Sequence, residues 1–358
     1  MRGYCRLTRK SSSLTNRRKR HPYLNCHDYP LCVNTHSVTI GYQSRRPCGE
    51  SWISVCLVFQ SRQTHLLKGG TLMIRFGGPV IPTFESTGYD AEAYATLHEQ
   101  KGYRAAYVPS GLRTTETHAI RDLRRAFDKR GIVFAELGIF NNMLDTDLPS
   151  RNANREEVMQ GLHLAELMQA RCFVAILGTF AHGRCRDAHV AANFARDAFD
   201  AAVELARHFI DTVDPKHTYF AFESFPFNVI DSPEAIARLV EAVDRERFGV
   251  HLDLVNLINS PRKYFSSADL MKQCVKLFGN KIVSAHAKDI RLRVPSISVM
   301  FEEVIPGQGN LDMAAYLTGL NRLPNEVPLM LEHLETEEDY DQAADYIRFT
   351  ASTLDITL

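Results

Sequence analysis

From Met73 to Leu358, the sequence alternates eight times between a short apolar run and a longer amphipathic run. Short apolar runs are typical of buried strands and amphipathic runs of helices, so this order predicts strand–helix units around a parallel sheet. The expected strands cover residues 74–79, 104–108, 132–137, 172–177, 218–223, 249–254, 282–287 and 328–334. The expected helices cover residues 91–101, 116–130, 155–170, 187–212, 233–245, 267–278, 313–320 and 337–353.

Eight such units favour a closed (β/α)8 barrel, which usually has about 250 residues. The alternative is an open doubly wound sheet, which usually carries a G-x-G-x-x-G phosphate loop after its first strand. Gly77-Gly78 follows the first expected strand and does not fit that pattern. We therefore predict an α/β fold, a single-domain TIM barrel over residues 73–358.

Residues 1–72 have a different character. They hold 12 basic and 2 acidic residues, which leaves 30 basic and 40 acidic residues in the rest of the chain. They show neither helical nor strand periodicity, and a nucleic-acid-binding arm or a targeting peptide would each account for the charge. We favour a third interpretation, in which Lys68-Gly69-Gly70 is a translated ribosome-binding sequence of a bacterial gene. Met73 would then be the true start, and residues 1–72 would be an unstructured extension absent from the native protein.

Composition limits the classes of function. An acidic body gives no electrostatic reason to expect nucleic-acid binding. The longest early apolar run, residues 53–59, is far shorter than the roughly 20 residues of a membrane span. Cys172, Cys185 and Cys274 are widely spaced and form no C-x-x-C motif, as in a reduced cytosolic protein. We expect a bacterial cytoplasmic protein whose partner is a small molecule.

The ends of the last four expected strands carry ionisable residues. These residues, one from each of four consecutive strands, are Glu223, Asp253, His286 and Glu332. Side chains alternate between the two faces of a strand, so Glu223 shares a face with Ala221, whereas Phe220 and Phe222 point the other way. The sixth and eighth strands show the same pattern. The apolar faces suit packing against helices, so the ionisable residues should point into the barrel mouth, where TIM barrels carry their chemistry.

Three carboxylates and one imidazole at one level predict a metal site. Burying three carboxylates together is very costly unless a cation neutralises them. This ligand set suits one divalent ion, with Mn²⁺ as our first choice and Mg²⁺, Co²⁺ or Zn²⁺ as alternatives. Taken singly, each carboxylate is more often a loop anchor and each histidine a packed core residue. Four in series favour the metal site.

With these residues the sequence resembles the sugar phosphate isomerase/epimerase superfamily, the xylose-isomerase-like TIM barrels. This group includes ketose 3-epimerases, inosose dehydratases and endonuclease IV enzymes. The resemblance covers Met73–Leu358. Its supporting stretches are AELGIFNNMLD (135–145), HLDLVNLINSPRKYF (251–265), HAKD (286–289) and PGQGNLD (306–312).

The resemblance implies that the four residues hold one metal and that Glu223 and Glu332 act as acid and base on opposite faces of a sugar carbon. The implied activity is a metal-dependent sugar isomerase or epimerase, which moves a proton next to a carbonyl through an enediolate. A lyase on the same scaffold, an inosose-type dehydratase or a 3-oxo-glycoside- or C-glycoside-cleaving eliminase, is the alternative. A non-catalytic sugar-binding barrel is a further class. Some relatives work as complexes with a second subunit, so the resemblance is compatible with a homo-oligomer or a second-subunit complex for this chain.

The sequence also departs from the family pattern. Asn256 stands where endonuclease IV enzymes and many ketose 3-epimerases have a histidine, which argues against DNA repair. Leu292 replaces an arginine expected six residues after the ligand histidine, with Arg291 and Arg293 on either side. We expect the substrate to be held by residues near the mouth, namely Lys288, Asn256, Glu136, Asn142 and Arg293.

Overall fold

The computed structural model describes residues 74–358, except 184–187, 189 and 296. The predictions about residues 1–72 and about Met73 as the start lie outside the described residues. None of the helices described within this range is long and apolar enough to cross a membrane.

Eight parallel strands form one sheet in the order β5-β4-β3-β2-β1-β10-β7-β6. The two ends of this sheet meet, because the Phe220 amide donates to Arg247 O at 2.8 Å and the Gly249 amide donates to Phe220 O at 2.9 Å. This confirms the predicted (β/α)8 barrel. The strands are β1 (Ile74–Gly77), β2 (Ala105–Tyr107), β3 (Val133–Ile139), β4 (Cys172–Ala175), β5 (Tyr219–Phe222), β6 (Val250–Leu252), β7 (Ile282–Ala287) and β10 (Val327–Leu331).

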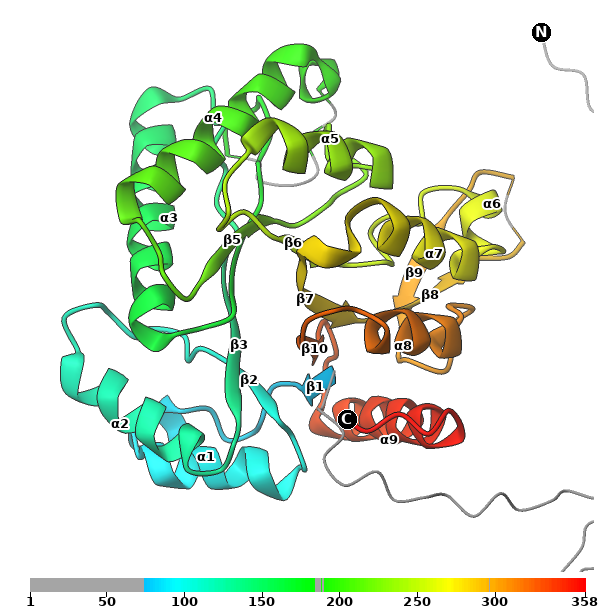
Figure 1. The fold of residues 1–358 in the computed structure, drawn as a ribbon. Coiled ribbons are helices and arrows are strands. Elements are labelled where there is room, and N and C mark those ends of the chain that lie inside the picture. Colours follow the sequence, from blue (N-terminus) through cyan, green and yellow to red (C-terminus); the bar gives the residue numbers. More distant parts are fainter. Residues whose placement is uncertain (1–73, 184–187, 189, 296) are drawn as a thin grey trace, which may run out of the picture. The chain divides into compact units, whose positions relative to one another are not determined.

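The helices lie outside the ring of strands (Figure 1). They are α1 (Ala91–Gln100), α2 (Thr117–Asp128), α3 (Leu148–Met168), α4 (Arg196–Val213), α5 (Pro233–Val243), α6 (Pro261–Tyr264), α7 (Ser267–Phe278), α8 (Met313–Asn321) and α9 (Glu337–Thr353). Short 3-10 helices occur at η1 (Glu85–Thr87), η2 (Ala191–Phe194) and η3 (Gly279–Lys281).

Two helix starts differ from the sequence prediction. Helix α3 begins at Leu148, not at residue 155, because the Asp147 side chain accepts a hydrogen bond from the Ser150 amide and Pro149 suits the first turn. Helix α4 begins at Arg196, whereas the sequence predicted a helix from residue 187. The prediction is wrong for the described residues between 187 and 196, where the chain forms η2 and Ala195 has an extended conformation.

The interior of the barrel is filled by small clusters of side chains. One contains Cys172, Val174, Ala221 and Val283, and another contains Ala105, Ala135 and Met330. The large aromatic residues of the same strands, such as Phe173 and Phe220, belong to the main core between strands and helices. Small interior residues thus alternate with large outward-facing residues along each strand, as the sequence predicts. At the carboxyl end of a strand, the next inward-facing position is available for a polar side chain.

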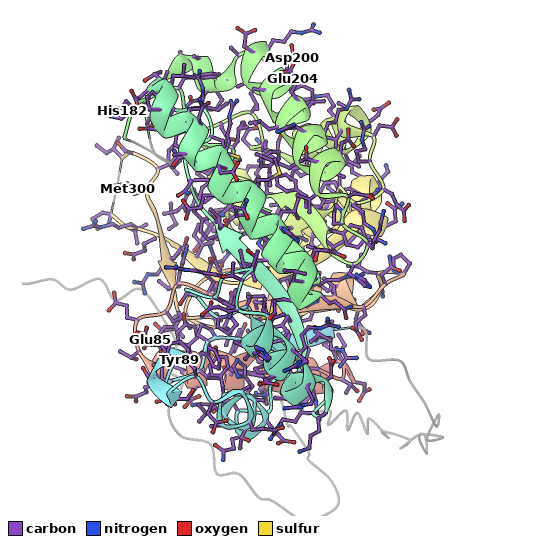
Figure 2. The ribbon with its side chains drawn as sticks, turned by 90° about the vertical axis from the view of Figure 1, so that its left-hand side faces the viewer. Glu85, Tyr89, His182, Asp200, Glu204 and Met300 are labelled. Carbon is purple, nitrogen blue, oxygen red and sulfur yellow. The ribbon has the colours of Figure 1, made fainter. Side chains whose placement is uncertain are left out.

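An antiparallel hairpin, β8 (Asp289–Leu292) and β9 (Phe301–Val304), follows β7 and was not predicted. Its base is fixed by Asp289, whose carboxylate accepts hydrogen bonds from the amides of Ile290, Gly307, Gly309 and Leu311. Figure 2 shows that Met300 in this hairpin, His182 after β4 and Tyr89 after β1 lie on one side of the barrel. That side is the mouth formed by the carboxyl ends of the strands.

Candidate metal centre

The structure brings four predicted residues together at the mouth. Glu223 directly follows β5, Asp253 follows β6, His286 lies in β7, and Glu332 follows β10. One ligand atom from each lies within 4.8 Å of those of the other three. The side chains of Glu223, Asp253 and His286 are almost fully buried, and that of Glu332 is 17% exposed. Four separate strand ends thus form one compact, acidic cluster.

Lys288 is the cation nearest to these carboxylates. Its Nζ lies 2.8 Å from Asp253 Oδ2, 2.6 Å from Glu332 Oε2 and 3.9 Å from Glu223 Oε1. The lysine follows β7 by one residue and shares the inward face of His286. Its single charge cannot balance three carboxylates. A divalent ion together with Lys288 would balance them.

The ligand atoms fit a divalent cation. Asp253 Oδ2, Glu332 Oε2 and Lys288 Nζ are buried, yet none has a well-aligned hydrogen bond. His286 Nδ1 faces the same place, 3.0 Å from Glu332 Oε2 and 3.6 Å from Asp253 Oδ2. Carboxylate oxygens next to an imidazole nitrogen form a donor set that suits Mn²⁺, Mg²⁺ or Zn²⁺.

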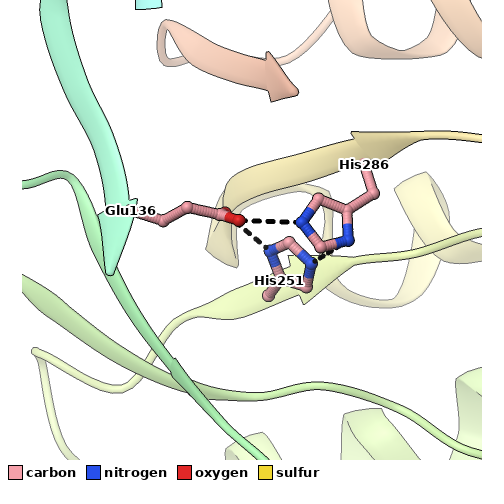
Figure 3. A group of neighbouring side chains, drawn as sticks. All are labelled: Glu136, His251 and His286. Carbon is pink, nitrogen blue, oxygen red and sulfur yellow. Dashed lines mark hydrogen bonds and ion pairs between the residues drawn. The ribbon is translucent and has the colours of Figure 1, made fainter. Parts of the chain in front are cut away.

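The other nitrogen of His286 is held from the barrel interior. Nε2 lies 2.7 Å from Glu136 Oε1, and Ser284 Oγ donates to Glu136 Oε2 at 2.5 Å. His251 also belongs to this network, because its Nδ1 lies 3.0 Å from Ser284 Oγ. Its Nε2 lies 3.1 Å from His286 Nδ1, the nitrogen that faces the carboxylates. Figure 3 shows Glu136 reaching from β3 toward the two imidazole rings of β6 and β7. Such a carboxylate orients a metal-binding histidine and keeps the proton on the nitrogen that faces away from the metal.

The pKa values of this cluster favour protonation of Glu223 and His286 when metal is absent. Burial, together with the neighbouring Asp253 and Glu332, raises the pKa of Glu223 to about 8. Burial acts in the same direction on Asp253, but Lys288 and His286 outweigh it and hold the Asp253 pKa well below its ordinary value. Burial lowers the pKa of His286, but the surrounding carboxylates outweigh it and place that pKa well above its ordinary value. A bound divalent ion would replace the protons on Glu223 and His286.

The Glu136 contact gives a testable prediction. Glu136→Gln keeps an acceptor for His286 Nε2 but removes the charge that strengthens the imidazole as a ligand. We expect Mn²⁺ affinity to fall about 10- to 100-fold, as is typical when such a partner is removed. Calorimetric titration of the metal-free protein would measure this change. Glu156→Gln, at an exposed position of α3, should leave the affinity unchanged. Equal affinities of the wild type and Glu136→Gln would contradict the role.

The five residues that were expected to hold substrate lie in different places, and only some of them are at the cluster. The Asn256 side chain donates to Glu223 Oε1 at 2.8 Å, so it lies at the cluster. Lys288 and Glu136 also lie there. Glu136 contacts His286 and His251, and none of its described ion pairs is with Lys288. Asn142 is engaged elsewhere, because its amide joins the loop after β3 to Thr179 and Ala181. Arg293 is exposed in the β8–β9 hairpin. Neither Asn142 nor Arg293 gains support as a substrate contact.

Sequence reasoning did not find three residues that support the centre. Ser284 lies two residues before His286 on the same face, and this spacing was the available signal. The Tyr107 hydroxyl donates to Leu331 O at 3.0 Å. The Tyr316 hydroxyl lies 2.9 Å from His286 O and 3.0 Å from Leu252 O, so it holds β6 and β7 together just below the ligands. The tyrosines carry no signal in their local sequence, because their partners are backbone atoms far away in the chain.

Two cavities described in the structure reach the cluster at Glu332. The large cavity has a volume of about 890 Å³, includes Glu136, and lies between the loop after β2, the end of β3 and the middle of α3. The small cavity has a volume of about 280 Å³ and is lined by charged residues that include Lys288, Glu303 and His333. A small molecule therefore has room beside the carboxylates on two sides.

A closed parallel barrel with four candidate ligand residues at its mouth, three of them buried, defines a TIM-barrel protein with a candidate metal centre. The family model described as a xylose isomerase-like TIM barrel matches residues 86–350, and the chain belongs to this family. This confirms the superfamily that the sequence predicted. A search of curated proteins found no match.

Similar solved structures share the fold at low sequence identity. The IOLI protein with a binding zinc atom is 18% identical, with a TM-score of 0.54 over 79% of this chain and 97% of that chain. A xylose isomerase-like TIM barrel protein from Mycobacterium smegmatis in complex with magnesium is 14% identical, with a TM-score of 0.54 over 79% and 97%. The 3-keto-D-glucoside 4-epimerase YcjR from E. coli is 11% identical, with a TM-score of 0.54 over 79% and 100%.

Proposed function

We propose that this protein is a divalent-metal-dependent sugar isomerase or epimerase. The observation that carries the proposal is the convergence of Glu223, Asp253, His286 and Glu332 within 4.8 Å at the mouth of the barrel. Membership of the xylose isomerase-like family supports it, as do similar structures named as sugar epimerases. In this proposal the four residues hold one ion, Mn²⁺ by preference, because three of the four ligands are oxygen donors.

The proposed chemistry is removal and return of a proton next to a carbonyl. When bound, the divalent ion supplies Lewis-acid stabilisation of the negative charge that develops on the carbonyl oxygen. Glu223 and Glu332 come from strands β5 and β10, which are not neighbours in the sheet order, so their carboxylates approach the site from different walls. One takes the proton from the substrate carbon, which gives an enediolate. The other returns a proton, either to the opposite face of the same carbon, which inverts it, or to the former carbonyl carbon, which moves the carbonyl.

The residues around the two glutamates keep them in position. Asn256 donates to Glu223 Oε1, which leaves the second oxygen of that carboxylate free to accept a proton. Lys288 lies close to both Glu332 and Asp253, so it would balance negative charge as the enediolate forms. Burial of the cluster strengthens these electrostatic contacts because water is excluded.

Isotope exchange tests the proposal. The Mn²⁺-loaded protein would be incubated in D₂O with a panel of ketoses and 3-oxo sugars, and products would be identified by NMR and mass spectrometry. We expect one class to return as its isomer with deuterium at the carbon next to the carbonyl. An enone or a released leaving group would identify the lyase that shares the first step. Absence of exchange across the panel, with metal bound, would overturn the proposed proton transfer.

A further inference from the structure

The two cavities that meet at Glu332 have different chemistry. The small cavity is lined by charged side chains, including Lys288, Glu303 and His333. Most of the lining of the large cavity is apolar, and its volume of about 890 Å³ lies at the upper end of the range of about 300 to 1,000 Å³ typical of sites for drug-sized ligands. A free ketose is much smaller than such a ligand. The space beside the carboxylates is therefore larger and less polar than a free ketose requires.

The backbone explains how the large cavity forms. Strand β2 ends at Tyr107, and after Val108 the chain continues as Pro109-Ser110-Gly111, whereas β3 continues to Ile139. The last contact between the two strands is the hydrogen bond from the Val108 amide to Glu136 O. Beyond that point β3 pairs only with β4, and the loop after β2 diverges from it. The large cavity lies in the gap between this loop and the end of β3, and Glu136 is part of its lining.

The walls of this gap are apolar near the strands. Leu112 comes from the loop after β2, and Leu137, Ile139 and Phe140 come from the end of β3. All four side chains are only partly buried, so they present apolar surface to the cavity. Gly138 between them carries no side chain, and the Phe140 ring packs against it. Partly exposed apolar side chains that line a cavity next to charged groups indicate a ligand with one apolar end and one polar end.

We propose that the large cavity is a subsite for an apolar substituent, and that the substrate is a sugar linked to an aryl or alkyl group. The sugar lies against the carboxylates and Lys288, and the substituent occupies the cavity lined by Leu112, Ile139 and Phe140. This inference rests on the proposed function, which places the sugar at the four-residue cluster. It deepens that function, because it excludes a small free ketose as the preferred substrate.

Matched glycosides test the subsite. Calorimetry would compare the 3-oxo derivatives of phenyl and methyl glycosides of glucose, galactose and xylose on the full chain, both Mn²⁺-loaded and metal-free. We expect at least one phenyl glycoside to bind about 10-fold or more tightly than its methyl partner, because the phenyl ring buries more apolar area. Equal affinities within every pair, or no phenyl glycoside binding, would overturn the inference. The metal content of the same samples reports separately on the proposed function.

Substitutions in the wall locate the effect. Leu112→Asp should abolish the preference for phenyl, and Leu112→Ala should reduce it several-fold, with melting curves checking that both variants fold. Phe349→Asp, at an exposed position of α9, is the control and should keep the full preference. A phenyl preference that survives in both folded Leu112 variants would place the aromatic ring elsewhere and overturn the assignment.

Discussion

Replacing Glu332 by glutamine is expected to lower the rate of substrate deuterium exchange about 10²- to 10⁴-fold, the usual contribution of a positioned acid or base. The amide cannot take or give the proton, although its oxygen can still face the metal. The exchange rate would be measured at saturating Mn²⁺, with bound metal measured in the same sample. This separates loss of proton transfer from loss of the ion, because Glu332 is also a proposed ligand.

Glu338→Gln is the matched control for this experiment. Glu338 is exposed in the first turn of α9, only six residues further along the chain, and the substitution makes the same chemical change. We expect its exchange rate to equal that of the wild type. Unchanged exchange in Glu332→Gln, with substrate still converted, would remove this glutamate from the mechanism and leave Glu223 as the remaining candidate.

The second large effect concerns Lys288. Its ammonium group is buried and lies within 2.8 Å of Asp253 and Glu332. Lys288→Met therefore removes the nearer of the two cationic groups that face these carboxylates when metal is absent, His286 being the other. Removing one partner of a buried ion pair typically costs about 3 to 5 kcal/mol. We expect the metal-free variant to lose about that much free energy of unfolding. Most of the loss should be regained with saturating Mn²⁺, because the ion replaces the missing positive charge.

Urea unfolding in chelator and in Mn²⁺ would measure both quantities. Lys272→Met serves as the control, since Lys272 is exposed on α7 and pairs only with exposed Asp269 among its described ion pairs. Its free energy of unfolding should change by no more than about 0.5 kcal/mol in either condition. If Lys288→Met gains no more stability from Mn²⁺ than the wild type gains, the lysine and the metal do not neutralise the same carboxylates.

The strand positions and four predicted ligands could be read from the sequence because they depend on local periodicity. A strand end in a parallel barrel fixes the level of a side chain, and alternation fixes its direction. For that reason Glu223, Asp253, His286 and Glu332 could be placed together before any contact was known. Their roles as ligands and catalysts remain predictions that the experiments above address.

Other features depend on contacts between distant segments, which periodicity does not report. The hydrogen bond between Glu136 and His286 joins β3 to β7 across the barrel, and only the three-dimensional register places the two residues together. The large cavity depends on β2 ending before β3 does. By contrast, the start of α3 did have a local signal, because Asp147 followed by Pro149 is a typical helix start.

The most direct test of the account is the metal content of the purified protein and of His286→Ala, each loaded with Mn²⁺, desalted and measured by elemental analysis. His118→Ala is the control, since His118 is exposed on α2, and its Nδ1 lies 2.8 Å from Arg121 Nη2. The account predicts about one divalent ion per chain in the wild type and in His118→Ala, and loss of that ion in His286→Ala. Absence of bound metal from the wild type would make the cluster an ion-pair network with Lys288 and would contradict the proposed function.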